Sequence, residues 1–127
     1  MTWSLPKCIA FLVLLVLAGC CGDNQAATAR ARGLSQQRLS QLYSQVGTLR
    51  ESGRTSLTAA DIPVELADLK PEGVYFHDST VWIHLSGCVD DKVYLFLHGY
   101  GEELSSRSIV LSLGESKPQE LLWQPRR

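Results

Sequence analysis

Residues 73–86 read Gly-Val-Tyr-Phe-His-Asp-Ser-Thr-Val-Trp-Ile-His-Leu-Ser and decide the fold. On both sides of Asp78-Ser79, aliphatic side chains alternate with polar or ring-bearing ones, which is the pattern of half-buried β-strands. Asp and Ser are common in tight turns. The stretch therefore predicts a β-hairpin of residues 73–77 and 80–86 joined by a two-residue turn.

The same alternation returns in residues 92–98 and 107–113. Residues 121–124 are expected to form a short fifth strand or a packed tail. Strands joined by short loops pair antiparallel. The second half of the chain therefore predicts an antiparallel meander of four or five strands.

Two loops define one common register for the first three strands. A turn at 78–79 and a loop over 87–91 place the same side chains on each face of the sheet. The expected partners are Phe76 with Val81, Tyr75 with Trp82, Trp82 with Phe96, His84 with Tyr94 and Thr80 with His98. One face is expected to be an aliphatic core of Val74, Phe76, Val81, Ile83, Leu85, Val93, Leu95, Leu97, Ile109, Leu111 and Leu113. The other face is expected to carry Tyr75, His77, Trp82, His84, Tyr94, Phe96 and His98.

Two helices are expected before the strands. Residues 34–52 predict an amphipathic helix, because Leu39, Leu42, Val46 and Leu49 recur at spacings of three and four. Residues 58–61 resemble a capping box and predict a short second helix that ends before Pro71. Helices followed by strands predict an α+β domain in which both helices pack on one face of the meander.

The N-terminal stretch has the layout of an export signal. Lys7 precedes an apolar run over residues 8–18, about half the roughly 20 residues that a bilayer-spanning helix needs. The run ends in Leu17-Ala18-Gly19-Cys20, which resembles the lipobox of bacterial lipoprotein precursors. The resemblance implies diacylglycerol on the Cys20 sulfur, cleavage before Cys20 and acylation of the new amino group. An ordinary secretory signal or an uncleaved anchor is the alternative.

This interpretation divides the chain into three segments. Residues 1–19 are expected to be a lipoprotein signal peptide, residues 20–33 a lipidated flexible tether, and residues 34–127 a single α+β domain. The tether is expected because residues 21–33 are small and polar, without apolar periodicity. Residue 21 is Cys, whereas Asp there is linked with inner-membrane retention in enterobacterial lipoproteins. The resemblance therefore implies an outer-membrane anchor facing the periplasm.

The cysteines and the balance of charged residues narrow the possible functions further. With Cys20 lipidated, Cys21 and Cys88 remain beyond the signal, and disulfides persist in exported proteins. They are interpreted either as a disulfide pair or, for Cys88, as a small hydrophobe in a turn. The chain has 12 basic and 13 acidic residues. That balance is unlike the basic footprint of nucleic-acid-binding proteins.

The ring-bearing face has three interpretations. It is a solvent-facing sheet surface, a binding platform or a metal site. A platform would bind through Tyr75, Trp82, Tyr94 and Phe96, since interfaces favour aromatic residues. A metal-binding envelope protein or an enzyme would use His77, His84 and His98, although the register keeps these apart and no Cys-x-x-Cys or His-Glu-x-x-His spacing occurs.

Together these features predict a non-enzymatic, lipid-anchored envelope protein without a cofactor. Its expected partners are the membrane, through Cys20, and another envelope protein. An immunity or inhibitor lipoprotein is an alternative of the same kind. Residues 98–101, His-Gly-Tyr-Gly, are expected to form a flexible bend rather than a phosphate-binding loop.

Overall fold

The computed structural model describes residues 23–87, 92–113 and 120–125, and within them the fold is α+β, as predicted. In this part of the chain two α-helices, α2 (Asn24–Arg32) and α3 (Gln36–Arg50), precede all the strands. The strands are β1 (Ser56–Thr58), β2 (Gly73–Phe76), β3 (Thr80–Ser86), β4 (Val93–His98), β5 (Ser108–Leu113) and β6 (Glu120–Trp123). Three short 3₁₀ helices lie between them: η1 (Ala59–Asp61), η2 (Val64–Leu69) and η3 (Leu104–Ser106). The expectations for residues 1–19, Cys20, Cys21 and Cys88 lie outside the described residues.

The strands form one open antiparallel sheet in chain order, from β1 to β6. The predicted register is confirmed across the three central strands: Tyr75 pairs with Trp82, Trp82 with Phe96, His84 with Tyr94 and Thr80 with His98. The sheet has six strands rather than four or five. The additional strand, β1, has only three residues with one buried side chain, Leu57, and is too short for alternation to reveal it.

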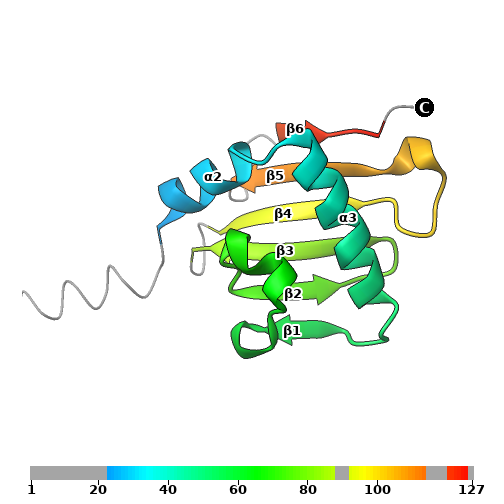
Figure 1. Ribbon diagram of the computed structural model, residues 1–127, viewed down its shortest axis with the longest axis horizontal. Helices are drawn as coiled ribbons and strands as arrows, with labels where there is room; N and C mark the ends of the chain where they lie inside the picture. Colours follow the sequence, from blue (N-terminus) through cyan, green and yellow to red (C-terminus); the bar gives the residue numbers. More distant parts are fainter. Residues whose placement is uncertain (1–22, 88–91, 114–119, 126–127) are drawn as a thin grey trace, which may run out of the picture.

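The predicted aliphatic face is the core. Val74, Val81, Ile83, Leu95, Leu97, Ile109 and Leu111 are all fully buried. Helix α3 covers them with Leu39, Leu42, Tyr43 and Val46, which confirms the amphipathic stripe. The Ser35 side chain accepts a hydrogen bond from the Arg38 amide at 3.0 Å and caps the helix. In Figure 1, α3 crosses diagonally over the strands, so one face of the sheet is covered by helix.

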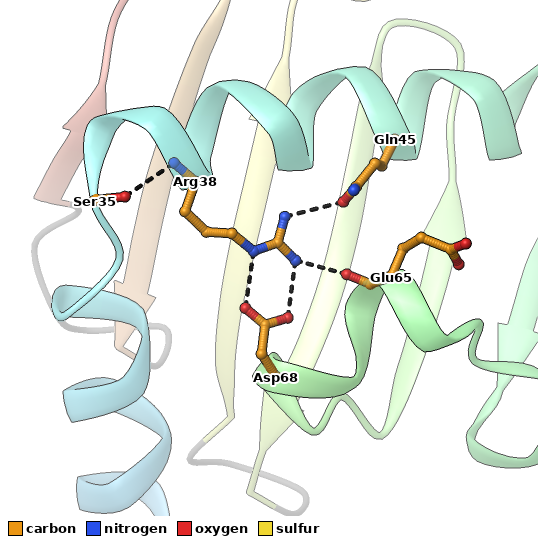
Figure 2. A network of polar contacts seen from close by, with 5 residues as sticks. All are labelled: Ser35, Arg38, Gln45, Glu65 and Asp68. Atoms are coloured by element: carbon orange, nitrogen blue, oxygen red, sulfur yellow. Dashed lines mark hydrogen bonds and ion pairs between the residues drawn. The ribbon is translucent and has the colours of Figure 1, made fainter.

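The predicted short helix is a 3₁₀ helix, η2, with Leu66 and Leu69 buried. It ends at Leu69, and the residue that caps it, Lys70, has a left-handed φ of 48° and precedes Pro71. Arg38 joins this segment to α3 (Figure 2): its guanidinium donates to both Asp68 carboxylate oxygens at 2.8 Å, to the Glu65 carbonyl at 2.6 Å and to Gln45 at 2.9 Å. The hydrogen bonds from Arg38 hold the pKa of Asp68 below its usual value.

The predicted flexible tether over residues 20–33 is wrong for the part that the structure describes. Asn24–Arg32 form α2, with the Asp23 side chain accepting from the Ala26 amide at its start. Ala27 and Ala31 are 0% and 1% exposed, so the helix is packed rather than free. Alanine has the highest helix propensity and allows close packing, but it contributes little to an apolar periodicity. The folded domain therefore begins about ten residues earlier than predicted.

Candidate functional site

The second face of the sheet is the candidate site. We call the side chains of Tyr75, His77, Trp82, His84, Tyr94, Phe96 and His98 the aromatic face; they come from β2, β3, β4 and the turn after β2. In Figure 1 the helices α2, α3 and η2 all lie on the near side of the sheet. The aromatic face is on the opposite side, and no helix within the described residues covers it.

Six of these rings form an unbroken chain of contacts. Ring centroids are 4.3 Å apart for His77 and Trp82, 5.4 Å for Trp82 and Phe96, 5.5 Å for Tyr94 and Phe96, 5.0 Å for His84 and Tyr94, and 6.1 Å for Phe96 and His98. Trp82, Tyr94 and Phe96 each contact three other rings, because Trp82 also contacts Tyr94 edge-on at 6.1 Å. Aromatic pairs at such separations contribute about 0.5–1.5 kcal/mol each beyond area burial. The rings therefore form a rigid surface, since each one restrains its neighbours.

The four predicted contact residues divide into two pairs. Tyr75 and Trp82 are 40% and 38% exposed, whereas Tyr94 and Phe96 are half-buried between neighbouring rings. The Tyr75 ring lies over Gly73, because a Cβ built on that glycine would be 3.1 Å from the Tyr75 hydroxyl. Tyr75 and Trp82 are therefore the more exposed pair, and Tyr94 and Phe96 pack against Trp82 from the neighbouring strand.

Most of the residues that flank the rings on β1 and β5 have small hydroxyl side chains. The register places Ser56 beside Tyr75 on β1, and Ser112 beside Tyr94 on β5. Thr58 and Ser108 occupy equivalent positions on the same two strands, next to Gly73 and His98. Val110 of β5, opposite Phe96, lies between the two serines. The face therefore has an aromatic centre on β2 to β4, flanked by hydroxyl residues on β1 and by two serines and a valine on β5.

The three histidines of this face each have a local partner. The His77 ring lies against Trp82, the His84 Nε2 is 3.0 Å from the Ser86 carbonyl and 3.6 Å from Glu72, and the His98 Nδ1 is 3.2 Å from the Thr80 hydroxyl. Burial lowers the pKa of His98. His84 lies on β3 four residues from Thr80, the partner of His98, so about 13 Å of strand separates the two histidines. Among the described residues, no group of three potential ligands is placed to hold a metal ion.

Sequence reasoning missed a pair of tyrosines on the covered face. Tyr100 is only 7% exposed, and its ring stacks on Tyr43 of α3 with centroids 4.3 Å apart. The amides of Gly99 and Tyr100 both donate to the Ser79 carbonyl, at 2.9 and 3.0 Å. Residues 98–101 are therefore a fixed turn, not the flexible bend that was predicted. Gly99 is required there, because its φ is 92° and a Cβ would be 2.5 Å from the Ser106 carbonyl oxygen.

Two hollows lie beside the sheet, at its two ends. One of about 470 Å³ is lined by Asn24, Gln25, Thr28, Arg32, Val93 and Leu113, at the start of α2. The other, of about 680 Å³, is lined by Arg50, Gly53, Arg54, Phe76, His77 and Asp78. In the second hollow Arg50 donates to the Asp78 carbonyl and Arg54 pairs with Asp61 at 3.3 Å, so both cations have partners within the chain.

Comparisons with known proteins do not add to this geometry. No protein-family model, curated protein or solved structure matches the chain. No helix in the part of the chain that the structure describes is long and apolar enough to cross a bilayer.

Proposed function

We propose that this protein is a non-enzymatic, lipid-anchored envelope protein that binds another envelope protein through its aromatic face. The observation that carries the proposal is the exposure of Tyr75 and Trp82 on a sheet face that no described helix covers. Large contiguous apolar patches are uncommon on the surfaces of monomeric proteins and mark interaction sites.

The layout of the face supports a protein partner. Protein interfaces have a core enriched in Trp, Tyr and Phe and a polar rim. Here Trp82 contacts three other rings, and the hydroxyl residues Ser56 and Ser112 lie on the flanking strands β1 and β5. Rigid aromatic side chains lose little conformational entropy on binding, so such a face suits a stable complex.

The contacts of the histidines favour a structural role for them over a catalytic one. A general base needs a ring nitrogen within hydrogen-bond reach of a substrate proton. Ring nitrogens of His84 and His98 are instead hydrogen-bonded within the sheet, to Ser86 and Thr80. Both histidines also contact neighbouring rings, which restrains them as parts of the surface.

The anchor is proposed from Leu17-Ala18-Gly19-Cys20, on its resemblance to a lipobox. Two or more acyl chains hold a protein stably on a membrane, whereas one does so only marginally. Intact mass measurement of the purified protein is expected to show a chain that starts at Cys20 and carries acyl groups. Cys20→Ser is expected to abolish both the cleavage before residue 20 and the acylation, and to release the protein from the membrane fraction. An unchanged mass and membrane association in Cys20→Ser would refute the anchor.

Partner binding is tested by affinity capture from cross-linked envelopes. Trp82→Ala removes an exposed ring that contacts three others, and a captured protein that binds this face is expected to be lost. Val64→Ala is the matched control, because Val64 is an 81% exposed apolar residue of η2 on the opposite side of the sheet. If folded Trp82→Ala protein captures the same proteins as wild type, the aromatic face is not the binding site.

A further inference from the structure

The interval between the proposed lipid site and the folded domain is short. Helix α2 begins at Asn24, with Asp23 as its N-cap, and Cys20 is three residues before Asp23. Three residues of fully extended chain span at most about 11 Å. The anchor therefore cannot lift the domain far from the bilayer, in contrast to the flexible tether that the sequence predicted.

The first turn of α2 is attached to one end of the sheet. Ser86, the last residue of β3, is 3% exposed and its hydroxyl donates to the Asn24 side chain. Asn24 also lines the hollow of about 470 Å³ together with Val93, the first residue of β4, and Leu113, the last of β5. The end of the sheet marked by Ser86, Val93 and Leu113 is therefore the end nearest to Cys20.

We propose that this end of the domain lies against the surface of the bilayer that holds Cys20. The inference rests on the proposed lipid anchor and adds the orientation of the domain. The surface that this end of the domain contacts is the lipid bilayer, because only about 11 Å of chain separates Asp23 from the acylated residue. The opposite end, with the turn at Asp78 and the bend at Gly101, points away from the membrane.

This orientation places the aromatic face at the side of the anchored domain. Strand β3 runs from Thr80 to Ser86 and spans about 20 Å. His84 and Tyr94 lie toward the membrane end of the face, and Thr80 and His98 lie toward the distal end. A partner that binds Trp82, midway along β3, would therefore approach along the membrane plane rather than from above.

The orientation is tested with the acylated full-length protein in nanodiscs that contain a gadolinium-chelating lipid. Amide relaxation in NMR spectra reports the distance of each residue from the lipid headgroups. Enhancement is expected to be greater by about tenfold or more at Val93 and Leu113 than at His77 and Gly101, because the two ends differ in height by about 20 Å. Equal enhancement at both ends, or more at Gly101, would overturn the inference.

A spacer variant tests whether the short connection causes the orientation. Inserting about 12 Gly and Ser residues between Gly22 and Asp23 adds a coil of roughly 20 Å. The difference in relaxation enhancement between the two ends is expected to fall severalfold. An unchanged difference would show that the short connection does not orient the domain. Intact mass separates the two proposals: an acylated Cys20 without a gradient overturns the orientation alone, and an unmodified Cys20 overturns the anchor as well.

Discussion

The rings of Tyr43 and Tyr100 stack 4.3 Å apart, and each hydroxyl donates to a main-chain carbonyl, Tyr43 to His98 at 2.6 Å and Tyr100 to Tyr43 at 2.7 Å. The guanidinium groups of Arg50 and Arg107 lie over this pair, 5.7 Å from the Tyr100 centroid and 5.9 Å from the Tyr43 centroid. Through these contacts α3 is fixed to the end of β4 and stays on the aliphatic face. The aromatic face is consequently left without a helix in the described part of the fold.

The Tyr100 hydroxyl is expected to contribute to stability. Tyr100→Phe removes a buried hydrogen bond and is expected to lower the free energy of unfolding by about 1 kcal/mol. Tyr75→Phe removes the hydroxyl of a residue that is 40% exposed on the other face and is expected to have an effect below about 0.5 kcal/mol. Urea denaturation of both variants measures the difference. Equal denaturation midpoints for Tyr100→Phe and Tyr75→Phe would contradict the role assigned to the tyrosine pair.

His98 is expected to make stability dependent on pH. Burial lowers its pKa from the usual 6.5, so the folded state disfavours the protonated ring relative to the unfolded chain. The stability from this site is complete above about pH 6.5 and is lost as the pH falls through the lowered pKa. Between pH 7 and pH 5, wild type is expected to lose more unfolding free energy than His98→Gln. Parallel curves in denaturation experiments across this range would exclude the effect.

Helix α2 is expected to behave as part of the folded domain. Ala27→Glu introduces a charge at a position that is 0% exposed and is expected to cost at least about 2 kcal/mol. Ala29→Glu places the same residue on the exposed side of the same helix and is expected to be nearly neutral. Thermal unfolding of the two variants distinguishes packing from a free tether, because a free tether would leave both melting temperatures unchanged.

Arg38 is expected to hold η2 on α3 through its planar guanidinium. Arg38→Lys keeps the charge but cannot donate to both oxygens of Asp68 and to the Glu65 carbonyl in the same geometry, and is expected to cost about 1 kcal/mol. Arg54→Lys is the control, because its contact with Asp61 is a single exposed pair at 3.3 Å. Comparable losses of stability in the two variants would show that the bidentate geometry is unimportant.

The central sheet was predictable because its signals are local. A two-residue turn at Asp78-Ser79 and alternation on both sides fixed the pairing of Tyr75 with Trp82, and the next loop agreed with it. The membership of the aromatic face followed from that register. How far each ring is exposed did not follow, because Tyr94 and Phe96 are shielded by neighbouring rings whose packing depends on β3 and β4 together.

The missed features have weak or distant signals. Helix α2 packs through alanines, which a search for large apolar residues ignores, and β1 contains one buried residue. The Arg38–Asp68 pair joins residues 30 positions apart, so no local pattern reveals it. Tyr100 lies between two glycines that suggest a bend, while its burial depends on the helix above it.

The central claim, that the aromatic face binds an envelope protein, is tested most directly by site-specific photo-cross-linking in cells that produce the anchored protein. A photoreactive phenylalanine analogue replaces Tyr75 or, as a control of equal exposure, Leu104 of η3; both are 40% exposed. We predict a discrete cross-linked product from position 75 that is lost when Trp82→Ala is added, and none from position 104. No product at position 75, or the same product from both positions, would contradict the claim.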